Sequence, residues 1–347
     1  MKLSSAIIFL PLILFASCEK EEAPENKKAK WIENAFGTLN SNAFSNVKAI
    51  SWWHENFDAS KLRIDSSPES LEAYKNAVTS SNYITDPDFV DGKLVEPKSG
   101  IYHSAFPDFG GTEDIVTEKR INDFEALVGN EILWAYFSNN WIDAIEFPLT
   151  DVETIINAGR IPFVRIMPRS NFEEGGPDTI YTLQRIIDGD FDAELVQWAL
   201  DAANSGIPLL AEFGTEVNGN WFPWNGQYNG GGDTNGYGDP EVADGPERFR
   251  DAYRHIIELC NENGANNITW FFHVDAYCEP DTDWNQIKNY YPGDGYIDWL
   301  GVSIYGPQES SEDYQEFSEI MNDIYPSLIS LSDKPIAILE FAITEIE

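Results

Sequence analysis

Two glutamates that follow apolar segments are the residues of this sequence best suited to acid–base chemistry. The first, Glu216, lies in the run EFGTEVNGNWFPW (212–224), where Asn-Gly and two tryptophans follow it. Tryptophan faces can stack on sugar rings, and burial against them would raise the pKa of Glu216, as a general acid requires. The structural alternative is that Glu216 caps the next segment while Trp221 and Trp224 fill the core.

The second glutamate, Glu340, stands at the end of the apolar segment PIAIL (335–339). Catalytic groups of parallel barrels gather at the C-terminal ends of strands. Two carboxyl groups ~5–5.5 Å apart suit a retaining glycosidase, in which one is the acid/base and the other the nucleophile. We therefore expect Glu216 and Glu340 to face each other across a barrel mouth.

The elements that must position these glutamates alternate from residue 101 onward. Continuous apolar runs predict seven strands, at 101–106, 132–137, 162–167, 208–213, 268–274, 297–304 and 335–341. Helical patterns lie between them, at 113–128, 150–158, 193–204, 246–263 and 314–331. Repeated β–α units of this kind predict a parallel sheet that is buried on both faces.

A parallel barrel needs an eighth strand, and the N-terminus supplies a candidate. Residues 27–39 read as a helix, 47–53 as a buried strand and 67–80 as a second helix. If strand 47–53 closes the sheet beside strand 335–341, the fold is an α/β (β/α)8 TIM barrel, circularly permuted with its eighth unit at the N-terminus. The alternative is a truncated chain whose first 80 residues form a separate appendage.

Several segments together resemble glycoside hydrolase family 26. The resemblance is carried by EFGTEVNGNWFPW (212–224), GPERFRDAYRHI (245–256), NITWFFHV (267–274) and KPIAILEFA (334–342). It implies a (β/α)8 barrel with catalytic glutamates on strands 4 and 7, acting on β-mannan or, more rarely, β-1,3-xylan or mixed-linkage β-glucan. The segments KAKWIENAFGTL and FSNVKAISWW resemble the family's segment C-terminal to the nucleophile, which implies the permutation independently.

The resemblance also assigns roles residue by residue. Glu216 matches the acid/base and Glu340 the nucleophile. Trp221 matches an aromatic residue downstream of the acid/base, and Tyr305 matches the tyrosine that contacts the nucleophile. Trp52 matches the aromatic floor under the sugar at the cleavage point.

Four further residues complete the expected substrate-binding set: Asn218, Trp224, His103 and His273. The two histidines end the first and fifth strands of the series that starts at residue 101, so they could face the mouth; burial in the core is the equal alternative. The family commonly has histidine immediately before the acid/base, where this sequence has Thr215. Because of that departure, mixed-linkage β-glucan and xylan are expected substrates alongside β-1,4-mannan.

A third carboxylate, Glu212, lies on the strand that leads to Glu216, where the family often carries a basic residue. It could raise the pKa of a neighbour or pair with Arg165. We expect Arg165, inside strand 162–167, to be a structural ion-pair partner.

Composition narrows the classes of partner. The 347 residues contain 59 Asp and Glu against 22 Lys and Arg, for a formal charge of −37. Binding phosphates requires clustered Lys and Arg, so nucleic acid and anionic lipid surfaces are excluded. A hydrophobic content of 42% with 14% aromatic residues also excludes a disordered acidic chain. A neutral polysaccharide is the expected partner.

The first residues of the chain resemble an export signal. Lys2 precedes an apolar run, and Ala16-Ser17-Cys18 resembles a bacterial lipoprotein processing site. We expect a signal peptide at 1–17, a lipid on Cys18, a linker at 18–26 and the hydrolase barrel at 27–347. The acidic run Glu19-Lys20-Glu21-Glu22 resembles the surface-export signal of Bacteroidetes lipoproteins, which implies an outer-membrane, cell-surface location. The alternative is a hydrophobic first helix of the fold.

The remaining cysteines, Cys260 and Cys278, flank a predicted strand of about 23 Å, far beyond the ~7 Å Cα limit for a disulfide. We expect two unpaired thiols, no metal, no cofactor and a monomer whose only membrane contact is the lipid. The sequence therefore predicts a retaining endo-β-glycanase, with a non-catalytic glycan-binding lipoprotein as the alternative.

Overall fold

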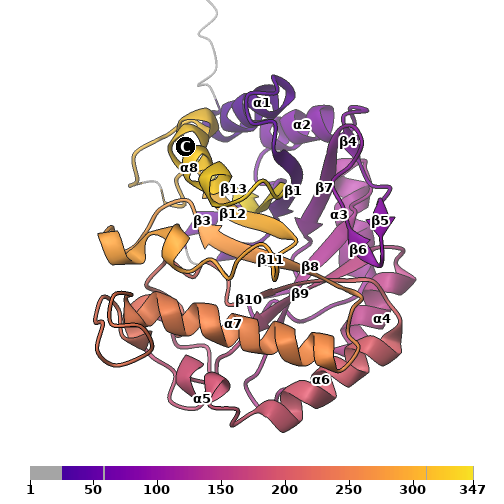
Figure 1. Ribbon diagram of the computed structural model, residues 1–347. Helices are drawn as coiled ribbons and strands as arrows, with labels where there is room; N and C mark the ends of the chain where they lie inside the picture. Colours follow the sequence, from indigo (N-terminus) through magenta and orange to yellow (C-terminus); the bar gives the residue numbers. More distant parts are fainter. Residues whose placement is uncertain (1–25, 58, 310, 347) are drawn as a thin grey trace, which may run out of the picture.

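The computed structural model describes residues 26–57, 59–309 and 311–346, and a closed parallel sheet forms their centre (Figure 1). Eight strands of the described residues close into the barrel: β1 (Val47–Trp53), β7 (Ile101–Phe106), β8 (Trp134–Asn140), β9 (Ile161–Met167), β10 (Leu209–Phe213), β11 (Ile268–Asp275), β12 (Trp299–Tyr305) and β13 (Ile336–Ala342). Each pairs in parallel with the next, and β1 pairs with both β13 and β7. The predicted signal peptide and Cys18 lie outside the described residues.

Helices surround this barrel. They are α1 (Lys27–Asn40), α2 (Pro68–Val78), α3 (Glu118–Val128), α4 (Leu149–Asn157), α5 (Leu183–Ile187), α6 (Asp192–Ser205), α7 (Asp244–Glu262) and α8 (Phe317–Leu331). The short 3-10 turn η1 (Gly226–Asn229) follows β10, and η2 (Asp283–Asn285) and η3 (Ile287–Asn289) replace a helix between β11 and β12. The alternation of parallel strands and outer helices confirms the predicted (β/α)8 TIM barrel.

The N-terminal unit is an integral part of the barrel. Ala49 of β1 lies opposite Ala337 of β13 and also opposite Tyr102 of β7. Trp31 of α1 packs on Phe341 of β13, with ring centroids 5.1 Å apart. The strand predicted at 47–53 therefore closes the sheet, and the alternative of a separate N-terminal appendage is wrong.

The described residues also form short strands, of which one joins the large sheet and the others make two separate two-stranded sheets. They are β2 (Asn56–Phe57) with β3 (Ser60–Lys61), β4 (Tyr83–Ile84) beside β7, and the hairpin of β5 (Phe89–Val90) and β6 (Lys93–Leu94). In the hairpin, the Leu94 N–H donates to the Thr269 hydroxyl, and its carbonyl accepts from the Trp299 indole. Since both partners lie near the starts of their strands, the hairpin covers the N-terminal end of the barrel and leaves the other end for a site.

The helix predicted at 113–128 begins only at Glu118. The Thr117 hydroxyl accepts the Arg120 N–H at 3.3 Å and caps the helix there. The preceding residues form a turn in which Glu113 has φ +61°. This turn frees Glu113 from the helix and lets its side chain reach the barrel mouth.

Cys260 and Cys278 are free thiols, as predicted. Across the described part of the chain, no helix combines the length and apolarity that crossing a bilayer would take.

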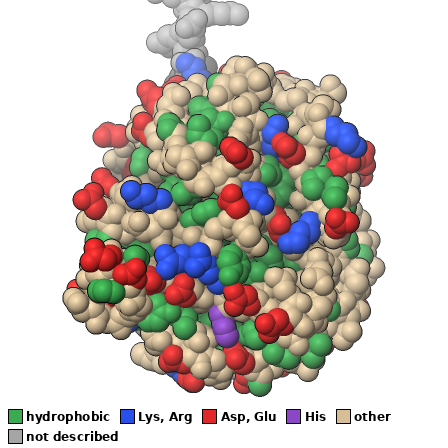
Figure 2. Space-filling model, viewed as in Figure 1, with side chains coloured by type: hydrophobic (Ala, Val, Ile, Leu, Met, Phe, Trp, Pro, Cys, Tyr) green, Lys and Arg blue, Asp and Glu red, His purple; other side chains and the backbone are tan. Residues whose placement is uncertain are grey.

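Charges of both signs are mixed on the face shown in Figure 2, where Lys and Arg side chains lie beside acidic ones. On α7, for example, Arg254 lies 3.7 Å from Asp251 and Arg248 lies 3.6 Å from Asp244. The basic side chains of α7 therefore lie beside carboxylates that offset their charge.

Candidate active site

A tight loop after β10 holds Glu216 at the barrel mouth. Gly214 has φ +62°, and a Cβ there would lie 2.9 Å from the Trp224 ring, so this turn requires glycine. The Asn225 side chain donates to the Glu216 carbonyl at 2.8 Å. Glu216 itself has φ +50°, an uncommon backbone region, and the Trp221 indole donates to its Oε2 at 2.8 Å. The loop therefore fixes both the backbone and the carboxylate of Glu216.

Glu340 reaches the same mouth from β13. The Tyr305 hydroxyl, at the end of β12, donates to its Oε2 at 2.7 Å. Arg165 of β9 places Nη2 3.0 Å from its Oε1. A cation and a hydroxyl donor therefore stabilise the ionised form of Glu340.

The two glutamates lie close together. One carboxylate oxygen of each is within 4.8 Å of the other, and Glu216 is 7% and Glu340 5% exposed. Burial, with the nearby Asp275 carboxylate, raises the pKa of Glu216 to about 8. Burial and the charge of Glu216 raise the pKa of Glu340 to about 7. Two adjacent, poorly solvated carboxyl groups resist double ionisation, so near neutrality the pair holds one proton.

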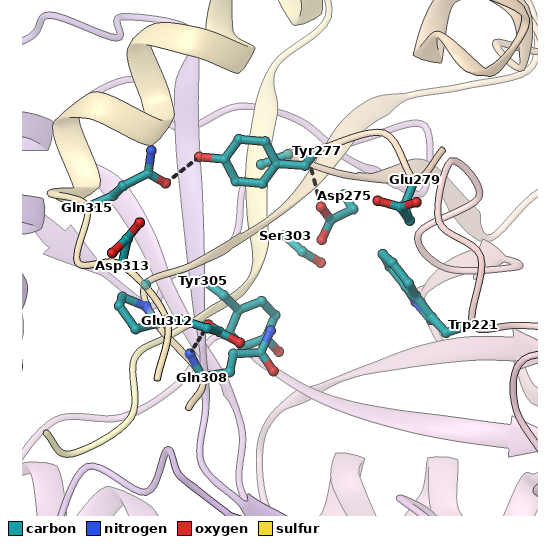
Figure 3. A pocket seen from close by; sticks show the side chains of 13 residues that line it. Trp221, Asp275, Tyr277, Glu279, Ser303, Tyr305, Gln308, Glu312, Asp313 and Gln315 are labelled. Carbon is teal, nitrogen blue, oxygen red and sulfur yellow. Dashed lines mark hydrogen bonds between the residues drawn. The ribbon is translucent and has the colours of Figure 1, made fainter. Parts of the chain in front are cut away.

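The pair faces a cavity of about 480 Å³. Its lining comprises Trp53, Glu55, Phe57, Gly111, Glu113, Arg165, Glu174, Glu216, Trp221, Phe222, Asp275, Tyr305, Gln308 and Glu340. A second cavity of about 300 Å³ shares Trp221, Asp275, Tyr305 and Gln308 with the first and continues to Tyr277 (Figure 3). Because they share walls, the two cavities form one groove that runs past the glutamates.

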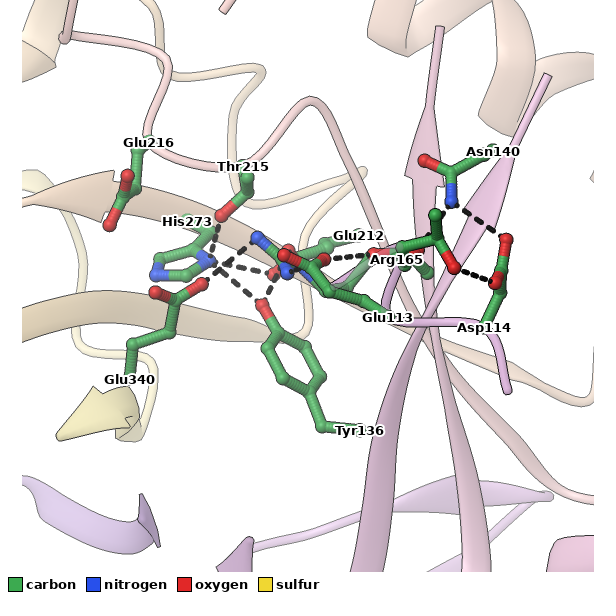
Figure 4. A network of polar contacts seen from close by, with 12 residues as sticks. Glu113, Asp114, Tyr136, Asn140, Arg165, Glu212, Thr215, Glu216, His273 and Glu340 are labelled. Atoms are coloured by element: carbon green, nitrogen blue, oxygen red, sulfur yellow. Dashed lines mark hydrogen bonds and ion pairs between the residues drawn. The ribbon is translucent and has the colours of Figure 1, made fainter. Parts of the chain in front are cut away.

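Arg165 is buried beside the pair and contacts three carboxylates, as Figure 4 shows. Its Nη1 is 2.5 Å from Glu113, its Nη2 is 3.0 Å from Glu340 and its Nε is 3.4 Å from Glu212. Pairing with Arg165 is one of the two roles that the sequence suggests for Glu212. The contact with Glu340 gives Arg165 a place in the site itself, beyond the structural role predicted for it.

His273, near the end of β11, lies under the two glutamates and outside the lining of the cavities. Its Nδ1 is 2.7 Å from the Thr215 hydroxyl and 2.9 Å from Glu212 Oε2. Its Nε2 is 2.9 Å from the Ser303 hydroxyl. His273 therefore belongs to the floor of the site, where it can act on the glutamates, and is not placed to touch substrate as predicted.

Among the described residues, Glu216, His273 and Glu340 form the one group whose ligand atoms are close enough to share a metal ion. A cation there would lie near the Arg165 guanidinium, which is 3.0 Å from Glu340. Both nitrogens of His273 also have polar partners already. The arrangement suits proton transfer better than cation binding.

The aromatic floor predicted at Trp52 lies one residue along β1, at Trp53. Trp52 is buried on the outer side of the sheet, with its ring 5.2 Å from Tyr74 and 5.1 Å from Phe341. Trp53 lines the cavity and stacks on Phe106 with centroids 4.0 Å apart. Successive strand residues point to opposite faces, so an offset of one residue moves the aromatic ring from the mouth to the helical layer.

Two other residues predicted to bind substrate have structural roles. Trp224 is buried, and its indole donates to the Thr215 carbonyl at 2.7 Å. Asn218 is also buried; its side chain donates to the Asp275 carbonyl and accepts the Asp275 N–H. They stabilise the loop that carries Glu216, because they tie it to itself and to the end of β11.

His103 is fully buried on the helical side of β7. Its Nε2 lies 2.9 Å from the Tyr74 hydroxyl of α2, and its Nδ1 lies 2.7 Å from the Glu131 carbonyl. Burial lowers its pKa to about 4, so it is neutral at pH 7. The prediction that His103 faces the mouth is wrong.

Four carboxylates that line the larger cavity were not predicted from the sequence: Glu55, Glu113, Glu174 and Asp275. Burial, followed by the charge of Glu113, raises the pKa of Glu55 to about 7, and burial raises that of Asp275 to about 7. Glu55 and Asp275 lie just after the end of β1 and at the end of β11, where this fold places functional groups, so these two positions could have been predicted. Glu113 lies further along, in the loop between β7 and α3. Together the four carboxylates make the groove strongly acidic.

The two tryptophans after Glu216 are expected to respond oppositely to alanine. Trp221→Ala should lower kcat/KM on the order of tenfold, ~1.4 kcal/mol, because a wall of the groove and the hydrogen bond to Glu216 Oε2 are lost, with little change in Tm. Trp224→Ala should instead destabilise the fold by about 3–5 kcal/mol, because it leaves a cavity beneath the loop. Thermal unfolding and kinetics of both variants test the distinction, and equal losses of Tm would contradict it.

The chain is similar to two characterised glycanases. It is 27% identical over 233 residues to Endoglucanase H of Acetivibrio thermocellus, which covers 66% of this chain and 23% of that protein. It is 24% identical over 228 residues to Beta-1,3-xylanase TXYA of Vibrio sp, which covers 65% and 42% respectively. The chain therefore spans less than half the length of either relative.

Among solved structures, the chain resembles the β-mannanase from a symbiotic protist of the termite Reticulitermes speratus, complexed with gluco-manno-oligosaccharide. The TM-score is 0.46 at 13% identity, and the match covers 92% of this chain and 80% of that one.

A family model matches residues 181–333. This stretch contains β10, β11 and β12, and with them Glu216, His273 and Tyr305. Its description is Glycosyl hydrolase family 26. The part of the chain that carries the candidate acid/base is therefore similar to glycosyl hydrolase family 26.

Proposed function

We propose that this chain is a retaining endo-β-glycanase of glycoside hydrolase family 26, with Glu216 as the acid/base and Glu340 as the nucleophile. The observation that carries the proposal is the approach of their carboxylate oxygens to within 4.8 Å. Retaining glycosidases hold their carboxyl groups ~5–5.5 Å apart, whereas inverting enzymes leave ~6.5–9.5 Å for a water molecule. The family match over residues 181–333 and the two glycanase relatives support the same activity.

In the proposed reaction each glutamate has one role in each of two steps. The Glu340 carboxylate attacks the anomeric carbon while Glu216 donates its proton to the glycosidic oxygen, so the bond to the leaving sugar breaks as the bond to Glu340 forms. The ionised Glu216 then takes a proton from water, and the water oxygen displaces Glu340 from the anomeric carbon. One water is consumed, and the anomeric configuration is retained.

The surroundings of the two glutamates fit these opposite roles. Arg165 and Tyr305 stabilise the Glu340 carboxylate, which must be ionised to attack. Asp275 lies near Glu216, and its negative charge favours the protonated form that an acid needs. Both pKa values are raised by burial, and Arg165 and the Tyr305 hydroxyl lower that of Glu340, as a nucleophile requires.

Activity is expected to depend on pH as a bell centred between about 7 and 8. Below pH 7, Glu340 takes up a proton and cannot attack; above pH 8, Glu216 loses the proton that the leaving oxygen needs. Both changes lower kcat/KM, about tenfold per pH unit on each limb. Initial rates from pH 4 to pH 10 test this, and an unchanged kcat/KM between pH 4 and pH 6 would contradict the raised pKa of Glu340.

The groove favours a neutral β-linked polysaccharide. Glu55, Asp275, Glu279 and Asp313 are among its acidic walls, and its one Arg in the described lining, Arg165, is already paired with carboxylates. Uronate or sulfate groups would be repelled there. We propose β-1,4-mannan as the preferred substrate, with mixed-linkage β-glucan and xylan as the alternatives. Because the groove continues past the glutamates, it supports cleavage within a chain.

Reducing-sugar release by the purified chain on mannan, mixed-linkage β-glucan and xylan tests this function. Release on one polymer names the substrate. Binding to one of them in gel-shift assays without release on any would replace the proposal with the non-catalytic glycan-binding protein.

We further propose a circular permutation relative to the family. Counting from β7, Glu216 follows the fourth strand and Glu340 lies on the seventh, as the resemblance requires, and β1 becomes the eighth. The pairing of β1 with β13 supports this order.

The location of the protein is also a proposal. Removal of residues 1–17 would leave Cys18 as the lipid-bearing first residue, residues 18–26 as a linker and 27–347 as a monomeric enzyme domain at the bacterial outer membrane. Radiolabelled palmitate incorporation that is lost in Cys18→Ala tests the anchor.

A further inference from the structure

The residue before Glu216 is a threonine, and an imidazole from another strand contacts it. His273 of β11 places Nδ1 2.7 Å from the Thr215 hydroxyl, and both side chains are buried. The same imidazole lies within 4.8 Å of carboxylate oxygens of Glu216 and Glu340. An imidazole therefore occupies the floor of the site, although it does not come from position 215.

Acidic and hydroxyl groups hold the Nδ1 side of this imidazole. Glu212 Oε2 lies 2.9 Å from Nδ1, and the Tyr136 hydroxyl, 3.2 Å from Nδ1, donates to Glu212 Oε1 at 2.6 Å. Burial alone would raise the pKa of Glu212, but His273 and Arg165 lower it below its ordinary value. Glu212 is therefore an anion, and Nδ1 carries the hydrogen that it accepts.

Ser303 of β12 connects the other side of the imidazole to the acid/base. Its hydroxyl lies 2.9 Å from His273 Nε2 and also hydrogen-bonds to Glu216. A serine hydroxyl has one hydrogen to donate. Ser303 therefore contacts the imidazole and the Glu216 carboxyl at the same time and can fix the orientation of that carboxyl.

We propose that His273 and Ser303 form a positioning relay that orients the acid/base Glu216 from the buried anion Glu212, in place of the histidine that the family commonly carries at position 215. The proposal rests on the proposed function, because it states how the acid/base of that reaction is held. His273 lies outside the lining of the groove and acts through Ser303 and the glutamates, so it is a positioning residue.

Kinetics of three variants test the relay. His273→Leu removes both polar contacts and should lower kcat about 100-fold with KM within about threefold, since misplacing a reacting group by ~1 Å costs about that much. His273→Gln keeps a polar group near Ser303 and should recover about tenfold of that loss. The matched control is His103→Gln, an equally buried histidine on the outer side of the barrel, which should leave kcat within about twofold and the pH profile unchanged.

Ser303→Ala supplies a readout that a purely structural role would not move. The Ser303 hydrogen bond lowers the pKa of Glu216, so its loss should shift the basic limb of kcat/KM to higher pH. Carboxyl ¹³C NMR of labelled glutamate should show the same shift in the titration of Glu216. An unchanged titration in Ser303→Ala, or the same shift in His103→Gln, would overturn the relay.

The NMR titration separates the two proposals. It needs no substrate, so a wild-type chain that hydrolyses no polymer but shows the Ser303-dependent shift would contradict the proposed function and support the relay. A wild-type chain that hydrolyses a polymer while Ser303→Ala titrates unchanged would support the function and contradict the relay.

Discussion

Glu340→Ala is expected to lower kcat/KM by at least about 10⁴-fold, because the attack that forms the covalent intermediate is lost. Sodium azide should partly restore turnover, since the small anion can occupy the space that the carboxylate leaves. It would attack from the side of Glu340 and yield a glycosyl azide of inverted configuration. Reducing-sugar assays with NMR of the azide product measure both effects.

Glu216→Ala completes this test, because loss of the acid/base and loss of the nucleophile should affect the reaction differently. Loss of the acid/base should cost about 10²–10⁴-fold on a polysaccharide but much less for bond cleavage in an aryl glycoside, whose leaving group needs no proton. Azide should then give a product of retained configuration, because it replaces water at the glycosyl-enzyme.

Glu153→Ala is the matched control for both variants, since Glu153 is an exposed residue of α4 outside the lining of both cavities and should stay within about threefold of wild type. Retained hydrolysis in Glu340→Ala, or inverted configuration from Glu216→Ala, would contradict the assigned roles.

Arg165→Met is expected to destabilise the fold by about 3–5 kcal/mol at neutral pH, because it leaves buried carboxylates without their cation. Arg165 contacts Glu113, Glu212 and Glu340 within 3.4 Å, and its own side chain is only 2% exposed. Urea unfolding at pH 7 measures the loss. Arg185→Met, which removes a half-exposed pair with Asp190, should change stability by only about 0–1 kcal/mol.

The loss of folding stability in Arg165→Met should increase as pH rises. Arg165 lowers the pKa of Glu340, so its removal raises that pKa further above the ordinary value of 4.5. A group whose pKa is raised in the folded state favours folding at low pH and loses this contribution as pH rises from 4.5 through its folded value. The difference from wild type should therefore be small near pH 4 and largest above pH 7; an equal difference at both values would contradict the electrostatic account.

The positions of the two candidate catalytic glutamates were readable from the sequence, because each depends on local pattern. Strands β1 and β7 occupy the predicted 47–53 and 101–106, and β13 lies within one residue of the predicted 335–341. An apolar strand that ends in a carboxylate places that carboxylate at the C-terminal rim of any parallel barrel. Strand order then brings Glu216 and Glu340 to one mouth.

The face on which each strand residue lies was decided only by the tertiary structure. Both faces of a barrel strand are buried, so the apolar pattern does not alternate, and Trp52 could not be told from Trp53. The same ambiguity placed His103 at the mouth, whereas it packs against Tyr74 of α2.

The polar connections beneath the pair were likewise set by the fold. Arg165, Glu212 and His273 come from three strands and meet only because the closed sheet brings those strands side by side. Glu113 joins them because its turn, at φ +61°, prevents the helix that local propensity predicts. Local pattern determined that Glu216 and Glu340 reach the barrel mouth; contacts between residues distant in the chain, which no local pattern encodes, decided how these two carboxylates are charged and held.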